Sequence, residues 1–347
     1  MQLLALDAEF QPVAYLPYLN LQWQREYYSP GKFSVQVPAE AYDTRMAYLY
    51  TPDRPEMGII QKPELSETVK GRFVQLSGFF LERLLDDKVV YPTYYATGAM
   101  DTAVLQMITA YKSDIPKLEI LPLPAAVAEA STWQVTGEAL GTAACAKLKT
   151  VQMALRCRYD YQQDKIFCEV WQGLDRTQSQ TVNNWVVFSD GFRNLSQVVA
   201  STDVSSLKNY AIVAGAGEGA EREVQVVDQT GGGYARQLWV DARDLRRDDQ
   251  EQTLAEYQAS LRQRGAEKLL EHQPIQNVEV DVTAGTFQYL RDFDLGDKVD
   301  VAVRELGLAM EARIVSVREV FKSNGHRVTL TLGEKKLTTL QKARMIF

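Results

Sequence analysis

The stretch that decides the fold class is Tyr289-Leu-Arg-Asp-Phe-Asp-Leu-Gly-Asp-Lys-Val-Asp-Val-Ala-Val303. Its second half alternates apolar and polar residues, as a half-buried antiparallel strand requires, and Gly296 supplies the tight turn before that strand. Runs with the same two-residue alternation lie on either side of it, at 278–282, 312–321 and 327–333. Asn324-Gly325 is a strong hairpin signal, because both residues tolerate positive φ. Residues 278–333 therefore predict a small antiparallel barrel or sandwich.

Residues 1–92 have the same β-rich texture. Leu21 to Tyr28 alternates, a turn is expected at 29–32, and the alternation resumes at Phe33. Further strands are predicted at 1–10, 12–18, 58–60 and 72–85, and a short helix is predicted at 39–49. The aromatic residues expected to hold this first barrel-like domain together are Trp23, Tyr27, Phe33, Phe73 and Phe79.

The texture changes after Pro92. Residues 101–111 have apolar side chains at helical spacing, and Asp101 can cap the start of this helix. A second helix is predicted at 138–149, and a hairpin is predicted from 151–161 and 165–172. The strongest helix in the chain is expected at 254–272, where apolar residues fall near one face among charged ones. The middle of the chain is therefore α+β.

Composition limits the kind of protein. The chain has 347 residues, of which 46% are apolar and 24% are charged, typical of a soluble globular protein with about two to four domains. Its net charge of −7 argues against a main role in binding nucleic-acid phosphates. The N-terminus predicts a strand rather than a signal peptide, and no window reaches the roughly 18 apolar residues of a membrane span. The widely spaced cysteines, expected as reduced thiols packed like small apolar residues in a protein made in the cytoplasm, are Cys145, Cys157 and Cys168.

One glycine-rich segment could suggest a nucleotide-binding loop. Gly215-Ala-Gly-Glu-Gly219 follows an apolar strand at 210–214. A dinucleotide-binding fold needs a helix after the glycines, so that the helix N-terminus meets the phosphate. The next run, 222–227, alternates as a strand, and a hairpin loop is therefore favoured.

The remaining candidate residues do not form a recognisable site. His272 and His326 are the only histidines; they lack metal-ligand spacing and are expected at the surface. A calcium loop would need a twelve-residue pattern with a terminal Glu, which is absent around the aspartates Asp292, Asp294 and Asp297. We therefore predict no catalytic, cofactor-binding or metal-binding residue.

The order of features resembles a known family. The segments that carry the resemblance are Asn194-Leu, Asn209-Tyr-Ala-Ile-Val-Ala-Gly-Ala-Gly, the long charged helix, Tyr289 to Val303, Ala312-Arg-Ile-Val-Ser-Val and Val328-Thr-Leu-Thr-Leu-Gly333. Together they are similar to the siphovirus-type tail hub proteins, the tail-associated, baseplate-hub family of long-tailed phages, prophages and phage-tail-like particles. The resemblance covers nearly the whole chain and is clearest over 188–333.

The resemblance implies an α+β, mainly β fold with two small antiparallel β-barrel domains and α+β middle domains, in one subunit of a homotrimer. The implied domains are a first β-barrel at 1–92, an α+β middle domain at 93–187, a second β-barrel at 188–233 and 275–335, a helical insertion at 234–274 that returns to the middle domain, and a C-terminal tail at 336–347. Because the chain stops soon after the second barrel, we expect a hub without a lysin or fibre extension.

The function implied by the resemblance is structural. A trimeric ring at the tail tip would join the tail tube or distal tail ring to the spike or fibre and would line the DNA channel. The expected partners are further copies of the chain, distal tail and tube proteins, a spike or fibre and the tape measure protein, with no stable nucleic-acid binding and no membrane span. The expected location is the tail tip or baseplate of the virion, after synthesis in the bacterial host cytoplasm.

Two alternative functions stay open from the sequence. The first is a cell-wall hydrolase of the tail tip, which would need a cleft with two carboxylates roughly 5–10 Å apart. The second is a carbohydrate- or receptor-binding module with an exposed aromatic platform built from Trp171, Trp185 or Trp239. We expect these tryptophans in the core instead.

Overall fold

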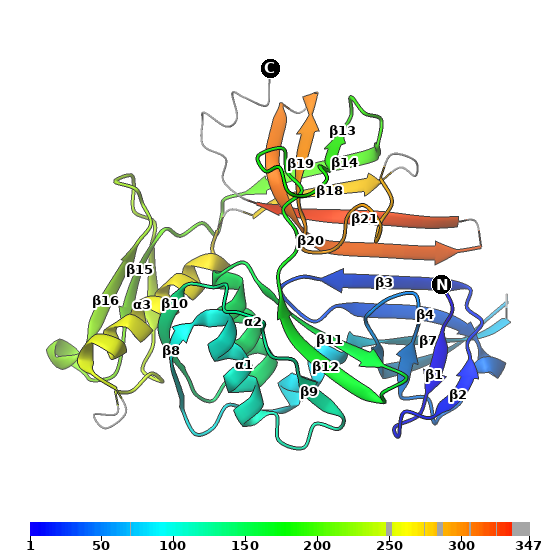
Figure 1. Ribbon diagram of the computed structural model, residues 1–347, viewed down its shortest axis with the longest axis horizontal. Helices are drawn as coiled ribbons and strands as arrows, with labels where there is room; N and C mark the ends of the chain where they lie inside the picture. The colour runs from blue at the N-terminus through cyan, green and yellow to red at the C-terminus, as the bar shows by residue number, and fades with distance from the viewer. Residues whose placement is uncertain are drawn as a thin grey trace.

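The computed structural model describes residues 1–69, 71–247, 252–273, 275–282, 287–304, 307–323 and 325–334. Strands dominate the chain, and the few helices gather in its middle part (Figure 1). The prediction of a mainly β, α+β fold is confirmed. No helix in these ranges is long and apolar enough to cross a membrane. The predicted tail at 336–347 and the first residue of the Asn324-Gly325 turn lie outside the described residues.

Both β-rich ends of the chain contribute to one large sheet. Its N-terminal strands are β1 (Leu4–Leu6), β2 (Pro12–Tyr15), β3 (Asn20–Glu26), β4 (Lys32–Pro38), β5 (Tyr48–Tyr50), β6 (Gly58–Thr68) and β7 (Gly71–Phe80). Its C-terminal strands are β13 (Val187–Ser189), β14 (Leu195–Asp203), β18 (Ile275–Val282), β19 (Lys298–Val303), β20 (Leu308–Lys322) and β21 (Gly325–Glu334). The order is β14-β18-β21-β20-β3-β4-β7-β6-β5-β1-β2, with β13 and β19 attached beside β20. The sheet is open along this path, and the two barrels stay a prediction.

The two halves of this sheet meet where β3 pairs with β20. The pairing is antiparallel and runs from Asn20 opposite Lys322 to Glu26 opposite Ser316. Both strands lie along the middle of the molecule, with the N-terminal strands on one side and the C-terminal strands on the other (Figure 1). The β3–β20 seam, as we call this pairing, therefore makes the two halves neighbours in one hydrogen-bonded surface.

Each half has its own apolar core. Trp23, Phe33 and Phe80 centre the core of the N-terminal half, where the ring centroids of Trp23 and Phe80 are 4.6 Å apart. Phe188 and Phe293 centre the core of the C-terminal half, with ring centroids 5.2 Å apart. Burial of alternate residues on each strand follows from the two-residue period of the sequence.

Two segments of the first domain differ from the prediction. The predicted helix at 39–49 is only the 3-10 turn Ala39–Ala41, because Leu49 is buried in strand β5. The predicted strand 72–85 ends at Phe80, and the 3-10 helix Leu81–Asp87 follows. Leu81 and Leu85 of this helix both belong to a third apolar core, which is built mainly by residues of the middle of the chain. These segments have mixed periodicity, so the packing of their apolar side chains decides between helix and strand.

Three of the predicted core aromatics lie outside the core of the N-terminal half. Phe79 is 39% exposed and Phe80 only 1% exposed, because Val74 and Leu76, of the same parity as Phe80, face the core of the N-terminal half. Tyr27 is buried, but it packs in the core of the C-terminal half, across the seam. Phe73, on the same face of β7 as Phe79, is only partly buried and is not part of this core. The expectation that Phe73, Phe79 and Tyr27 hold the first domain together is therefore wrong.

The middle region is α+β, as predicted. Its elements are β8 (Tyr94–Ala99), α1 (Met100–Tyr111), β9 (Leu118–Ile120), β10 (Ala130–Val135), α2 (Leu140–Thr150), β11 (Ala154–Asp160) and β12 (Lys165–Trp171). Strands β8 and β10 pair with each other, and the predicted β11–β12 hairpin extends to β9. Asp101 does not cap α1, since Ala99 is the N-cap; the Asp101 carboxylate instead accepts the N–H groups of Val127 and Ala128, at 2.7 and 3.0 Å.

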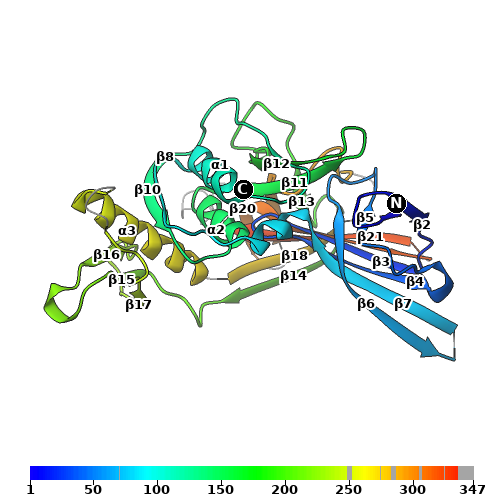
Figure 2. The ribbon, with the colours of Figure 1, turned by 90° about the horizontal axis from the view of Figure 1, so that it is seen from below.

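A small peripheral unit is built from β15 (Tyr210–Ala214), β16 (Val224–Asp228), β17 (Gln237–Asp241) and α3 (Leu254–Glu271). It lies at one end of the molecule, and the β6–β7 hairpin projects at the other (Figure 2). Strand β15 pairs with β16 on one side and with β17 on the other, and this small sheet is separate from the large one. Of the predicted barrel segment 188–233, only β13 and β14 therefore belong to the large sheet. The domain boundaries as such stay a prediction.

The neighbouring residues Phe79 and Phe80 provide a test of the strand phase, that is, of which alternate residues of β7 face the core. Phe80→Ala should lower the free energy of unfolding by about 3–5 kcal/mol, because it opens a cavity beside Trp23. Phe79→Ala is the matched control and should cost about 1 kcal/mol or less. Urea denaturation followed by tryptophan fluorescence measures both. Equal losses for the two variants would contradict the assigned phase.

Candidate functional site

The β3–β20 seam carries a buried polar network. Four alternating residues at the seam share the inward face and are fully buried: Leu21, Trp23, Arg25 and Tyr27. Arg25 is thus a charged residue at a core position of a strand. A buried guanidinium is tolerated only when several acceptors surround it.

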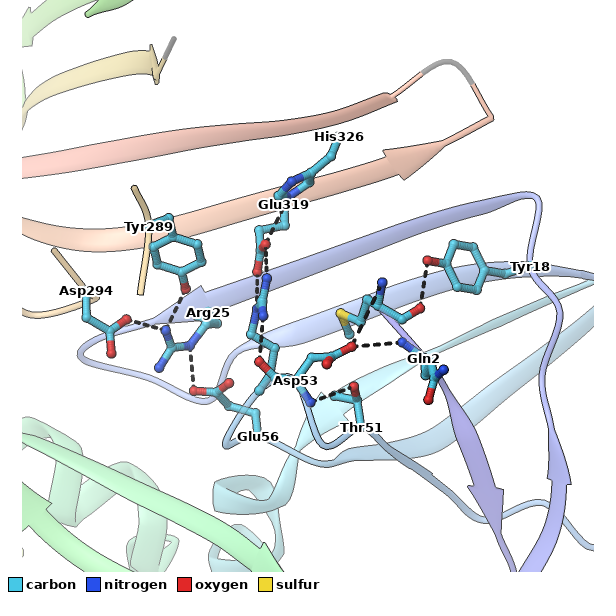
Figure 3. A network of polar contacts seen from close by, with 12 residues as sticks. Gln2, Tyr18, Arg25, Thr51, Asp53, Glu56, Tyr289, Asp294, Glu319 and His326 are labelled. Carbon is cyan, nitrogen blue, oxygen red and sulfur yellow. Dashed lines mark hydrogen bonds and ion pairs between the residues drawn. The ribbon is translucent and has the colours of Figure 1, made fainter. Parts of the chain in front are cut away.

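Arg25 finds those acceptors on two distant segments. Its Nε donates to Glu56 Oε1 at 2.6 Å, from the loop between β5 and β6. Its Nη1 donates to the Tyr289 hydroxyl at 2.6 Å and also to an Asp294 carboxylate oxygen. Figure 3 shows these side chains converging on Arg25. The N-terminal strand is therefore tied to the C-terminal stretch that begins at Tyr289.

A second ion pair crosses the seam beside the first. Arg54 Nε donates to Glu319 Oε2 at 2.7 Å, and a second guanidinium nitrogen reaches the other oxygen. Glu319 lies on β20, is completely buried, and also contacts His326 Nε2 at 3.0 Å. The Tyr289 ring lies near both arginines, with its centroid 6.0 Å from the Arg25 guanidinium and 5.6 Å from that of Arg54. This forked arginine–carboxylate contact fixes both distance and orientation across the seam.

Burial and ion pairing shift the pKa values of these groups in opposite directions. Burial alone would raise the pKa of Glu319, but hydrogen bonds from Arg54 and His326 outweigh it and hold that pKa below its usual value. Burial raises the pKa of Tyr289, which stays a neutral donor or acceptor. Glu319 is therefore a carboxylate at neutral pH, and the network keeps its charges paired.

The same loop between β5 and β6 also holds the N-terminal residues. Asp53 Oδ2 accepts the backbone N–H of Gln2 at 2.9 Å, and the Tyr18 hydroxyl donates to the Met1 carbonyl at 3.0 Å (Figure 3). Thr51 Oγ1 accepts the Asp53 N–H at 3.2 Å. One short loop thus contributes Asp53, Arg54 and Glu56 to contacts with three separate parts of the chain.

The stretch that begins at Tyr289 continues the network toward the middle region. Asp297 accepts from Arg176 Nε at 2.7 Å and from the Leu174 N–H at 2.8 Å. Gly296 has a φ of +83°, as the predicted turn requires, and a Cβ there would lie 2.5 Å from the Tyr27 ring. The turn therefore needs glycine for both its conformation and its close packing.

The sequence-predicted candidate sites take structural roles. The loop Gly215–Gly219 joins antiparallel β15 and β16, which confirms the hairpin interpretation. Asp292, Asp294 and Asp297 are each paired with an arginine. His326 contacts Glu319, and His272 Nδ1 lies 3.1 Å from the Ser206 carbonyl oxygen. Within the described ranges, no group of three or more His, Cys, Asp or Glu side chains could hold a metal ion.

The tryptophans of the predicted aromatic platform lie apart. Trp185 and Trp239 are 53% and 59% exposed, so the expectation that they are core residues is wrong. Trp239 is on β17 of the peripheral unit and Trp185 precedes β13 of the large sheet. Trp171 is partly buried and packs edge-on against Tyr27. The three rings do not form one surface, because they belong to different sheets or segments and no ring contact joins them within the described ranges.

One buried carboxyl group in the middle region titrates unusually. Glu82 lies in the 3-10 helix after β7, and its Oε1 accepts the Cys157 N–H at 2.8 Å. Burial raises the pKa of Glu82 to about 7. The group is therefore partly protonated at neutral pH without a role in any candidate active site.

The seam network predicts a large effect for one substitution. Arg25→Leu leaves Glu56 and Asp294 facing each other without their shared cation, and should lower the free energy of unfolding by about 3–5 kcal/mol. Arg45→Leu is the control, because Arg45 is exposed and its ion pair is with its near neighbour Asp43. It should leave the urea midpoint unchanged. Similar midpoints for the two variants would show that the network does not hold the seam.

Glu82 predicts a specific pH dependence. In the unfolded chain its carboxyl ionises near pH 4.5, whereas the folded protein keeps it protonated up to about pH 7. Stability should therefore fall by roughly 3 kcal/mol as pH rises from 4.5 to 7, and then level off. Glu82→Gln cannot ionise and should remove this component from urea titrations at a series of pH values. An unchanged profile in the variant would contradict the assignment.

The chain was compared with known proteins. A sequence model of the family described as siphovirus ReqiPepy6 Gp37-like protein matches residues 6–334. A search of curated proteins finds no significant match.

Solved structures of phage tail proteins share this fold. The tail protein from Neisseria meningitidis MC58 has a TM-score of 0.59 at 14% identity, over 99% of this chain and 98% of that one. The 43 kDa tail protein of prophage MuSo2 from Shewanella oneidensis has a TM-score of 0.60 at 13% identity, over 99% and 100%. Prophage tail protein gp18 from Listeria monocytogenes EGD-e has a TM-score of 0.54 at 12% identity, over 100% and 99%. At such identities the likeness establishes the fold alone, and the family match establishes the kinship: this chain belongs to the siphovirus ReqiPepy6 Gp37-like family.

Proposed function

We propose that the chain is the structural hub of the tail tip or baseplate of a phage or phage-tail-like particle. Three copies form a ring that joins the tail tube or distal tail ring to the spike or fibre. The protein is made in the bacterial host cytoplasm and ends in the virion. Membership of a siphovirus family and the fold shared with phage tail proteins support this proposal.

One observation carries the proposal: the two β-rich halves lie side by side as parts of one sheet. Closed rings are the common form of symmetric assemblies, and each copy in a ring presents the same surfaces to its neighbours. A subunit with two adjacent β-rich halves lets three copies present about six similar surfaces. Such a ring matches a sixfold tube on one side and a threefold spike on the other.

The buried network suits this role. A hub transmits force between tube and spike, so its two halves need a fixed relative position. The paired strands β3 and β20 and the buried arginine–carboxylate contacts across them restrict that movement. Packed, fully paired junctions are rigid in this sense because they have one arrangement rather than many.

The charge of the chain suits a DNA channel. A net charge of −7 favours a channel wall along which DNA slides without sticking. In the proposed ring, the wall is lined by uncharged and acidic side chains. A structure of the assembled ring whose wall is mostly Lys and Arg would contradict this part of the proposal.

The alternatives receive less support. A cell-wall hydrolase needs two carboxylates free to act in a cleft that admits a sugar. Glu279 and Asp281 line a groove of about 570 Å³, but Asp281 is buried and already bound by Thr329 and Arg327. Glu56 and Glu82 line a cavity of only about 10 Å³. A carbohydrate-binding module needs an aromatic platform, but the exposed rings of Trp185 and Trp239 belong to separate sheets. Neither the carboxylates nor the tryptophans therefore support a hydrolase or a carbohydrate-binding module as well as the fold supports a hub.

The oligomeric state tests the hub directly. Light scattering of the purified chain over a concentration series should show a species with three times the mass of one chain, and negative-stain images should show a threefold ring. Antibodies against the chain should label the tail tip of intact particles. A strict monomer at high concentration, together with labelling along the tail or at the head, would overturn the proposal.

A further inference from the structure

A small cavity lies where the N-terminal half, the middle region and the C-terminal half meet. It is lined by Arg25 of β3, Glu56, Glu82, Leu155 of β11, Trp171 of β12 and Leu295, with a few neighbours. Its volume is about 10 Å³. This is the space that one water molecule needs and is too small for a sugar, a nucleotide or a buffer molecule.

Four polar atoms of the lining residues have no partner among the residues that the structure describes. Two are donors, Nη2 of Arg25 and Nε1 of Trp171, and two are acceptors, Oε2 of Glu56 and Oε2 of Glu82. Arg25, Glu56 and Glu82 are all more than nine-tenths buried, so bulk water does not satisfy these atoms. Buried polar groups in folded proteins nearly always have a hydrogen-bond partner. Four such atoms around one cavity therefore point to a common ligand.

We propose that this cavity is an internal binding site for a single water molecule. When Glu82 is ionised, the water oxygen accepts hydrogen bonds from Arg25 Nη2 and Trp171 Nε1, and the two water hydrogens are donated to Glu56 Oε2 and Glu82 Oε2. Two donors and two acceptors complement the four hydrogen bonds of one water.

Other occupants fit less well. A cation would meet the Arg25 guanidinium, and an anion would meet the carboxylates of Glu56 and Glu82. The Glu56 carboxylate already binds Arg25 through its other oxygen, at 2.6 Å, and Oε1 of Glu82 already accepts the Cys157 N–H. One oxygen of each carboxylate is therefore already hydrogen-bonded within the protein, and a neutral molecule that both donates and accepts suits the remaining polar atoms.

The bound water has a structural consequence. Arg25 and Glu56 belong to the seam network, whereas Trp171 and the partner of Glu82, Cys157, belong to the β11–β12 hairpin of the middle region. The water therefore extends the seam network into the middle region. It also keeps Trp171 beside Tyr27, where the two ring centroids are 5.1 Å apart.

A crystal structure of the full chain at a resolution that shows ordered water tests the site. The expected result is a density peak at hydrogen-bond distance, about 2.6–3.2 Å, from at least three of the four atoms. Direct pairing of the four atoms with one another, or a cavity without density, would overturn the proposal.

A double-variant cycle at pH 8.5, where Glu82 is ionised, provides a second test. Trp171→Phe removes one donor, and Glu82→Gln replaces the free acceptor by a donor. Because both act on one water, their effects on the unfolding equilibrium constant should deviate from additivity by at least about twofold. Trp133→Phe is the control, since Trp133 Nε1 is also buried without a hydrogen-bond partner in the described part of the chain but does not line the cavity. Additive effects in both pairs would contradict the shared water.

Discussion

The burial of Arg25 is the constraint on which the rest of the structure depends. A guanidinium in the middle of a core strand is costly unless it is surrounded by acceptors, and its partners here come from Glu56, Tyr289 and Asp294. These residues are 31 to 269 positions away in the sequence. A buried ion pair adds little stability compared with an apolar pair of the same shape, so the contribution of Arg25 is to the specificity of the arrangement. Only one relative position of the two β-rich halves satisfies it.

The short stretch from Tyr289 to Gly296, with Asp297 directly after it, contacts three separate parts of the chain. Tyr289 and Asp294 contact Arg25, the turn at Gly296 packs on Tyr27, and Asp297 directly after the stretch binds Arg176. The segments before and after the middle region are thereby fixed to the same turn. In the proposed ring, this turn would keep the two halves of each subunit from moving independently.

Much of the local structure could be predicted from the sequence. The two-residue period gives strands β3 and β4 and the β11–β12 hairpin, and helix α3 begins as expected, with a capping box between Thr253 and Glu256. The phase of β7 was missed, because Phe79 and Phe80 are adjacent and only the burial of Val74 and Leu76 selects between them. The seam network was missed as well. One signal was available, since Arg25 alternates in phase with Leu21, Trp23 and Tyr27, but its partners lie too far along the chain for local patterns to reveal them.

The pairing of strands β15 and β16 shows why sheet membership is harder to predict than strand location. A two-residue period states which residues face a core, not which core. Ala211 and Val213 of β15 pack against Leu261 of α3. The opposite face of α3 meets the middle region through Gln263 to Ser131, at 3.2 Å, and through the buried pair of Glu267 with Lys147. Helix α3 therefore packs its apolar face on β15 and turns a polar face to the middle region, so β15 and β16 form a separate sheet under the helix. The sheet to which β15 belongs therefore depends on its contact with α3, and Leu261 of α3 is far along the chain from Val213 of β15. A local sequence pattern around β15 cannot reveal that contact.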